Sequence, residues 1–137
     1  MSVSGTATVH CKVFVVEDDP DVRESLSTLL RTHEYRVASA VHGKDALSQL
    51  SAGYTPDVIL LDMILPKLSG PEVYSRICAK NPEVPVLFAT GYSADLSLLE
   101  KVKQLGLPVL QKPYSPRDLA RKVRDALDKH VRSLLGH

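Results

Sequence analysis

Five polar residues stand at the ends of short apolar runs, and they are the residues of the sequence whose types best suit catalysis or metal binding. They are Glu17, Asp18, Asp62, Thr90 and Lys112. If the runs are strands of one parallel sheet, the set brings three carboxylates, one hydroxyl and one ammonium group to the carboxyl ends of the strands. Open α/β sheets place their sites at that edge. An apolar core does not need such a set, so we interpret it as a candidate functional site.

The chemistry of the set follows from its charges. Carboxylates held close together raise one another's pKa and destabilise the fold unless a cation relieves them. Mg²⁺ suits this place, because it favours a few carboxylates together with water and phosphate oxygens. A carboxylate beside Mg²⁺ can act as a nucleophile on phosphorus and form an aspartyl phosphate. Lys112 and the Thr90 hydroxyl would then contact the oxygens of the transferred group.

Each residue taken alone has an ordinary explanation. Asp19, the third acid of the run, is expected to cap a helix that has Pro20 at its first position. Glu17 and Asp18 could merely favour the positive end of that helix, a stabilisation of about 0.3–1 kcal/mol. Asp62 could form a turn. The coincidence of all five residues at one edge is what favours a site.

The elements that must position these residues are predicted by alternating patterns. Apolar runs typical of strands lie at residues 12–16, 35–40, 57–62, 85–90 and 108–113. Helical spacing of apolar residues follows each run, from residue 20 onward and then over 43–53, 71–80, 93–106 and 115–135. Such alternation with short connections predicts a parallel sheet with helices on both faces. The second run mixes apolar and polar residues, so we expect it nearer an edge of the sheet.

Size and composition fit a single globular domain. The chain has 137 residues, of which 44% are hydrophobic and 24% charged, enough to bury one core. The formal net charge of +1 gives no argument for nucleic acid or a membrane surface as partner. No apolar run approaches the roughly 18 residues of a membrane span. We expect a loose lead-in over residues 1–10, without the apolar core of a signal peptide, and a single domain over 11–135.

The cysteines and the last helix add little chemistry of their own. Cys11 and Cys78 lie far apart, match no metal or redox spacing, and fit a reducing compartment, so a cytoplasmic location is expected. Neither a cysteine nor a histidine ends a predicted strand, so no nucleophile other than a carboxylate is indicated. The basic residues of segment 115–135 alternate with aspartates, which is typical of a solvated helix face.

Four segments of the sequence resemble the receiver domains of bacterial two-component response regulators. They are VVEDD, DVILLDMILPKLSG, FATG and LQKPYSP, in the order and spacing of that family from residue 12 to about 130. The resemblance implies a flavodoxin-like (βα)5 three-layer sandwich, whose five-stranded parallel sheet has the order 2-1-3-4-5. It also implies a signalling phosphoacceptor rather than an enzyme with its own substrate.

The resemblance gives each site residue a role. Asp62 looks like the phosphoacceptor, and Glu17 and Asp18 look like the acidic pair that holds Mg²⁺. The backbone carbonyl of Ile64 would be a further metal ligand. Ile64 also departs from the chemotaxis members of the family, which carry a polar side chain there that can hydrogen-bond water. We therefore expect a comparatively long-lived aspartyl phosphate.

The remaining roles concern the response to phosphorylation. Thr90 looks like the switch hydroxyl that moves toward the phosphoryl group. Lys112 would pair with the phosphate, and its bond to Pro113 is cis in the family. Receivers often carry a mobile aromatic residue three positions before this lysine, where the present chain has Val109. A switch through an aromatic flip at that position is therefore not expected.

The resemblance also implies partners. A histidine kinase or a histidine phosphotransfer domain would donate the phosphoryl group, and a downstream protein would read the result. The segments ATGYSADL and LQKPYSPRDLARKVRDALD look more like receivers attached to hybrid sensor histidine kinases. Few residues follow the last helix, so we expect either a stand-alone receiver or part of such a kinase, as a monomer or weak dimer. Two alternatives stay open: a Mg²⁺-dependent phosphohydrolase with an aspartate nucleophile, and an interaction module that works without phosphorylation.

Overall fold

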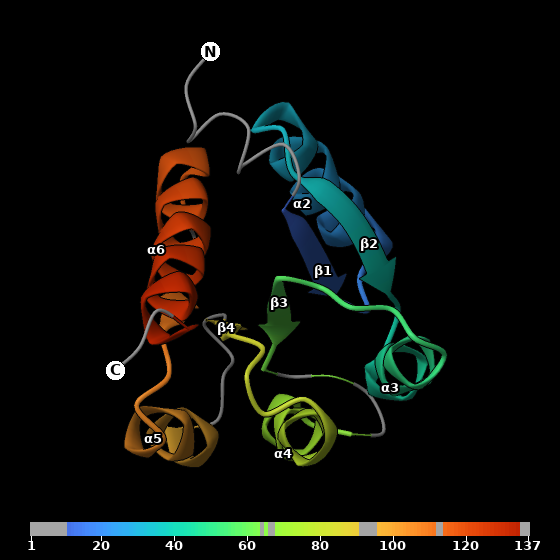
Figure 1. Cartoon of the computed structure of the whole chain (residues 1–137), viewed down its shortest axis with the longest axis vertical. Helices are drawn as coiled ribbons and strands as arrows, with labels where there is room; N and C mark the ends of the chain where they lie inside the picture. Colours follow the sequence, from blue (N-terminus) through green and yellow to red (C-terminus); the bar gives the residue numbers. More distant parts are fainter. Residues whose placement is uncertain (1–10, 64, 66–67, 91–95, 112–113, 135–137) are drawn as a thin grey trace.

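A computed structural model describes residues 11–63, 65, 68–90, 96–111 and 114–134 of the chain. Strands and helices alternate through these residues, as the sequence predicts (Figure 1). The strands are β1 (Lys12–Val16), β2 (Arg36–Ala40), β3 (Val58–Asp62), β4 (Val86–Thr90) and β5 (Val109–Gln111). The helices are α2 (Pro20–Thr32), α3 (Gly43–Ser51), α4 (Gly70–Lys80), α5 (Leu96–Gln104) and α6 (Pro116–Leu134). The predicted start of the fourth helix at residue 93 lies outside the described residues.

The five strands form one parallel sheet in the order β2-β1-β3-β4-β5. This confirms the predicted flavodoxin-like topology. It also places β2 at an edge, as its mixed pattern indicates. The central strands carry continuous apolar runs because both faces of a doubly covered sheet are buried. All four apolar residues of β3, for example, are buried, and only Asp62 at its end is partly exposed.

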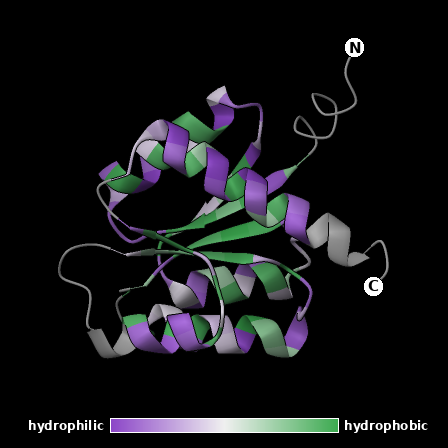
Figure 2. Cartoon of the chain, turned by 90° about the vertical axis from the view of Figure 1, so that its left-hand side faces the viewer, coloured by the Kyte–Doolittle hydropathy of each residue, from purple (hydrophilic) through white to green (hydrophobic). Residues whose placement is uncertain are grey.

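Two hydrophobic clusters lie on opposite faces of the sheet, so the fold has three layers (Figure 2). Along β1, Val13 and Val15 belong to one cluster and Phe14 and Val16 to the other, which is the period of two expected of a strand. Helices α2 and α6 contribute to the first cluster, and α3, α4 and α5 to the second. The limits predicted for the domain, residues 11–135, stay a prediction.

Candidate functional site

The register of the sheet brings the first acids beside Asp62. In the parallel pairing of β1 with β3, Val16 stands opposite Leu61. One residue further on, Glu17 and Asp62 therefore leave the two strands side by side. The Glu17 N–H donates to the carbonyl oxygen of Ala40 at 3.2 Å, which holds the start of the acidic run against the end of β2.

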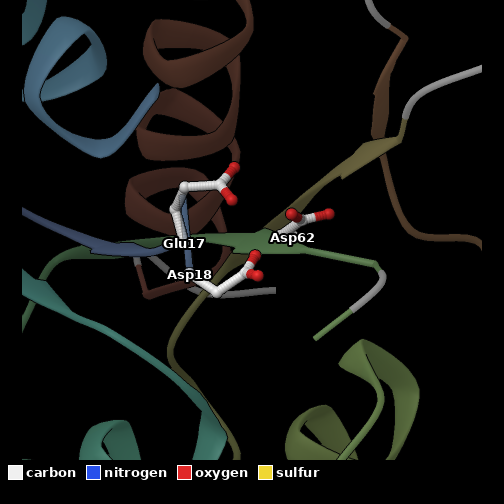
Figure 3. A group of neighbouring side chains, drawn as sticks. All are labelled: Glu17, Asp18 and Asp62. Atoms are coloured by element: carbon white, nitrogen blue, oxygen red, sulfur yellow. The ribbon is translucent and has the colours of Figure 1, made fainter. Parts of the chain in front are cut away.

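Glu17, Asp18 and Asp62 form a compact group of carboxylates (Figure 3). One oxygen from each lies within 4.8 Å of the others. Glu17 is only 3% exposed, Asp62 is partly buried and Asp18 is exposed. Bringing three carboxylates this close costs free energy unless a cation or a hydrogen-bond donor compensates their charge. Such an oxygen-rich group with one side open to water fits Mg²⁺, which keeps several water ligands.

Asp19 serves a different purpose from the two acids before it. Its Oδ1 accepts hydrogen bonds from the N–H groups of Asp21 at 2.9 Å and Val22 at 3.3 Å. Pro20 takes the first position of α2. Asp19 is therefore the helix cap that the sequence predicts, which confirms that the three consecutive acids are not one feature.

Arg23 supports the acidic run from α2, and the sequence alone does not single it out. Its Nη1 donates to the carbonyl oxygen of Glu17 at 2.9 Å and lies 3.4 Å from that of Asp18. The guanidinium thus fixes the backbone from which both carboxylates project. The spacing of Arg23 could have indicated this role, because Arg23 stands one helical turn after the cap Asp19, from where its side chain can reach back to the acidic run.

Thr90 ends β4 at the same edge of the sheet. It is 2% exposed and pairs in register with Gln111 of β5, whereas Asp62 pairs with Ala89. Its hydroxyl therefore comes from the strand adjacent to that of Asp62, as expected. The other two predicted contributors, Lys112 and Ile64, lie outside the described residues, as does the peptide bond between Lys112 and Pro113.

Tyr114 is a further neighbour of the site that the sequence does not predict. Burial raises the pKa of its phenol to about 12, and the negative charges of Glu17 and Asp62 add to the effect. The ring packs against the cluster between the sheet and helices α2 and α6. Val109, at the position where receivers often carry an aromatic residue, is partly buried and packs on the opposite face. Among the described residues, an aromatic side chain near these acids thus comes from the segment after β5.

Gly70 fixes the return of the chain after Asp62. Its N–H donates to the carbonyl oxygen of Met63 at 2.9 Å, and α4 begins at this glycine. A Cβ at this position would lie 2.7 Å from the carbonyl oxygen of Asp62 and 2.8 Å from the Cα of Met63. Only glycine allows such a close approach of two backbones.

The family model for the response regulator receiver domain matches residues 13–124 of the chain. The chain belongs to this family. The receiver domain resembles solved structures over most of its length. A response regulator receiver domain protein from Clostridium thermocellum has a TM-score of 0.82 and 26% identity, over 92% of this chain and 99% of that one. A CheY-like receiver from Methanospirillum hungatei has a TM-score of 0.83 and 25% identity, over 90% and 98% of the two chains.

Several curated relatives are longer proteins of different kinds. The CpxR homolog of Haemophilus influenzae, a transcriptional regulatory protein, is 33% identical over 116 residues, which are 85% of this chain and 50% of that protein. The sensor kinase CckA of Brucella abortus is 29% identical over 128 residues, 93% of this chain and 13% of that protein. The receiver domain thus spans half or less of these relatives. Within its described residues, no helix is both long and apolar enough to cross a bilayer.

Proposed function

We propose that Asp62 of this receiver domain accepts a phosphoryl group from the phosphohistidine of a histidine kinase or a histidine phosphotransfer domain. A carboxylate oxygen of Asp62 forms the new bond to phosphorus as the phosphorus–nitrogen bond breaks. The imidazole nitrogen keeps the electron pair and takes up a proton. The product is an aspartyl phosphate, a mixed anhydride formed without any further reactant.

The close grouping of Glu17, Asp18 and Asp62 within 4.8 Å carries this proposal. Glu17, Asp18 and Asp62, with the backbone carbonyl of Ile64, would hold Mg²⁺. When bound, the ion neutralises the carboxylates and the charge on the transferred group. The exposure of Asp18 leaves an open side from which a donor reaches Asp62.

Two other residues would recognise the phosphoryl group. Lys112 would pair with its oxygens as a point charge. Thr90, buried at the end of the neighbouring strand, would hydrogen-bond to the group and so couple phosphorylation to the surface beside β5. Lys112–Pro113 would be the cis bond known in the family.

The setting of the domain is also part of the proposal. We take residues 11–135 as one receiver domain after a loose lead-in, working in the cytoplasm as a monomer or weak dimer without direct contact to nucleic acid or membrane. It signals by changing partners rather than by turning over a substrate. The domain is either a stand-alone receiver or part of a hybrid sensor histidine kinase. The likeness to the sensor kinase CckA supports the second case.

Incubation with a small phosphodonor and Mg²⁺, followed by intact mass measurement, tests the function. We expect one phosphate on the wild type, none on Asp62→Asn and none when the metal is chelated. Asp57→Asn is a matched control, because Asp57 directly precedes β3, opposite the end that carries Asp62, and accepts a hydrogen bond from the Lys12 N–H at 2.7 Å. Steady release of phosphate from phosphomonoesters would instead support the hydrolase. Absence of any modification with Mg²⁺ bound would support the phosphorylation-independent module.

A further inference from the structure

A groove lies between the C-terminal halves of α3 and α4, away from the acidic site. It has a volume of about 360 Å³. Eight residues line it: Leu47, Leu50, Ser51, Arg76, Ile77, Ala79, Lys80 and Asn81. The two helices lie side by side on the same face of the sheet (Figure 1).

Helices α3 and α4 pack closely where they begin and leave a gap between their C-terminal halves. Gly43 begins α3, and a Cβ there would collide with the Cγ2 of Val73 in the first turns of α4. Glycine therefore lets the helices start in contact. Further along, Leu47 and Leu50 meet Ile77 across a wider gap that their side chains leave unfilled.

The groove has an apolar floor and a positive rim. Leu47 and Leu50 are only partly buried, so they offer apolar surface to a ligand. Arg76 and Lys80 are exposed one helical turn apart on α4, and none of the eight lining residues is acidic. Such a surface is complementary to a ligand that combines apolar side chains with carboxylates.

The acids of the two helices are engaged at the helix starts. The Oδ2 of Asp45 accepts the N–H of Val41 at 3.0 Å, and the Oε1 of Glu72 lies 3.3 Å from the Ser69 hydroxyl at the cap of α4. Neither carboxylate lines the groove. The positive charge of the rim therefore has no acidic neighbour within the groove itself.

We propose that this groove binds an acidic amphipathic helix of a protein partner. A trough between two neighbouring helices accepts a third helix by ridge-and-groove packing, with apolar anchors one turn apart. Those anchors would rest on Leu47 and Leu50, while flanking glutamates or aspartates would pair with Arg76 and Lys80. The inference does not depend on the chemistry proposed for Asp62.

Docking at the groove leaves the phosphoacceptor accessible. Helix α4 begins against the backbone of Met63, next to Asp62, and runs for 11 residues away from it. At 1.5 Å per residue, the groove end of α4 lies roughly 15 Å from that start. A partner could therefore stay bound while a histidine kinase or phosphotransfer domain reaches Asp62.

A helical peptide of about four turns, with leucines at i, i+3 and i+7 and glutamates beside them, is the probe. Titrated into the isotope-labelled full chain, it should shift amide resonances of the C-terminal halves of α3 and α4. The double variant Arg76→Glu, Lys80→Glu should weaken binding about tenfold or more, because two attractions become repulsions. Ala79→Trp, at an exposed lining position, should block the groove by size.

Matched controls separate this proposal from general charge effects and from the proposed function. Arg117→Glu, Arg121→Glu reverses two exposed charges one turn apart on α6 and should leave peptide binding unchanged. A peptide with lysines in place of the glutamates should not bind. Phosphate incorporation should stay at the wild-type level in the groove variants. Equal affinity for both peptides, shifts centred elsewhere, or full binding by the Arg76, Lys80 variant would overturn the inference.

Discussion

Two ends of this receiver domain are built by different physics: the carboxyl edge of the sheet, and the end at which a groove opens between α3 and α4. At the carboxyl edge, Glu17 and Asp62 leave neighbouring strands whose register is fixed by backbone hydrogen bonds. At the other end, the groove between α3 and α4 depends on how closely two helices approach, which the size of single side chains decides. Strand register can therefore hold like charges together against their repulsion, whereas helix packing leaves an opening wherever the side chains fail to fill it.

The two ends also differ in charge. The carboxyl edge gathers three carboxylates and suits a cation with a phosphoryl group. The groove places Arg76 and Lys80 beside an apolar floor and suits an acidic protein segment. With both assignments, the carboxyl edge changes its charge on phosphorylation, whereas the groove provides a protein contact that does not require phosphorylation.

Two glycines test whether the ends are independent. Gly70→Ala should be the more damaging change, because its Cβ meets backbone atoms of Asp62 and Met63, which have no rotamer to yield. We expect a loss of about 1–3 kcal/mol in the free energy of unfolding and reduced phosphorylation. Chemical denaturation and phosphate incorporation measure the two effects.

Gly43→Ala is the matched variant at the start of α3. The three atoms nearest to its Cβ would be side-chain atoms, of Val73 and Leu68, so the cost should be smaller and phosphorylation should survive. Helices α3 and α4 should move apart and change peptide binding at the groove. If Gly43→Ala impaired phosphorylation as strongly as Gly70→Ala, the two ends could not be treated as separate.

The adjacent acids Asp18 and Asp19 sharpen the account of the carboxyl edge. Asp18→Ala should weaken Mg²⁺ binding more than about tenfold, since it removes a direct carboxylate ligand and even indirect partners of metals contribute that much. Asp19→Ala should instead cost about 1 kcal/mol of stability through loss of the cap. Metal titration and thermal unfolding on both variants separate the effects. Equal losses of metal affinity would undo the division between these acids.

The smallest expected effect concerns Tyr114 at high pH. Its pKa in the folded chain is about 12, above the ordinary value of 10.0, so the folded state favours the unionised phenol. The resulting stability is fully present below pH 10 and is lost as the pH rises toward 12. Because solvent screens this part-exposed group, we expect about 1 kcal/mol. Tyr114→Phe should flatten that part of the pH profile of the unfolding free energy.

Tyr74 provides the comparison on the other face of the sheet. Its pKa is also raised to about 12, first by a hydrogen bond with Cys78 and then by burial. Asp62→Asn removes a negative charge near Tyr114 and should lower only the Tyr114 pKa, as followed by phenolate absorbance. An equal change at both tyrosines would mean that Tyr114 does not sense the acidic site.

The positions of Glu17, Asp18, Asp62 and Thr90 at the carboxyl edge could be predicted because their signals are local. An apolar run followed at once by an acid predicts both a strand and the position of its last side chain, as for Asp62. The cap at Asp19 is equally local. Arg23 and Tyr114 are harder to predict, because their contributions depend on how a helix and a returning segment pack against the strand ends. The groove at Arg76 is harder still, since it depends on the distance between two helices.

The central claim is that Asp62 carries the phosphoryl group, and chemical trapping of the acyl phosphate tests it most directly. Borohydride reduces an aspartyl phosphate to homoserine, which marks the residue permanently for peptide mapping by mass spectrometry. After phosphorylation with Mg²⁺ we expect homoserine at position 62 and at no other position. Homoserine at Asp18 or another carboxylate, or a stable phosphate that resists reduction, would contradict the account.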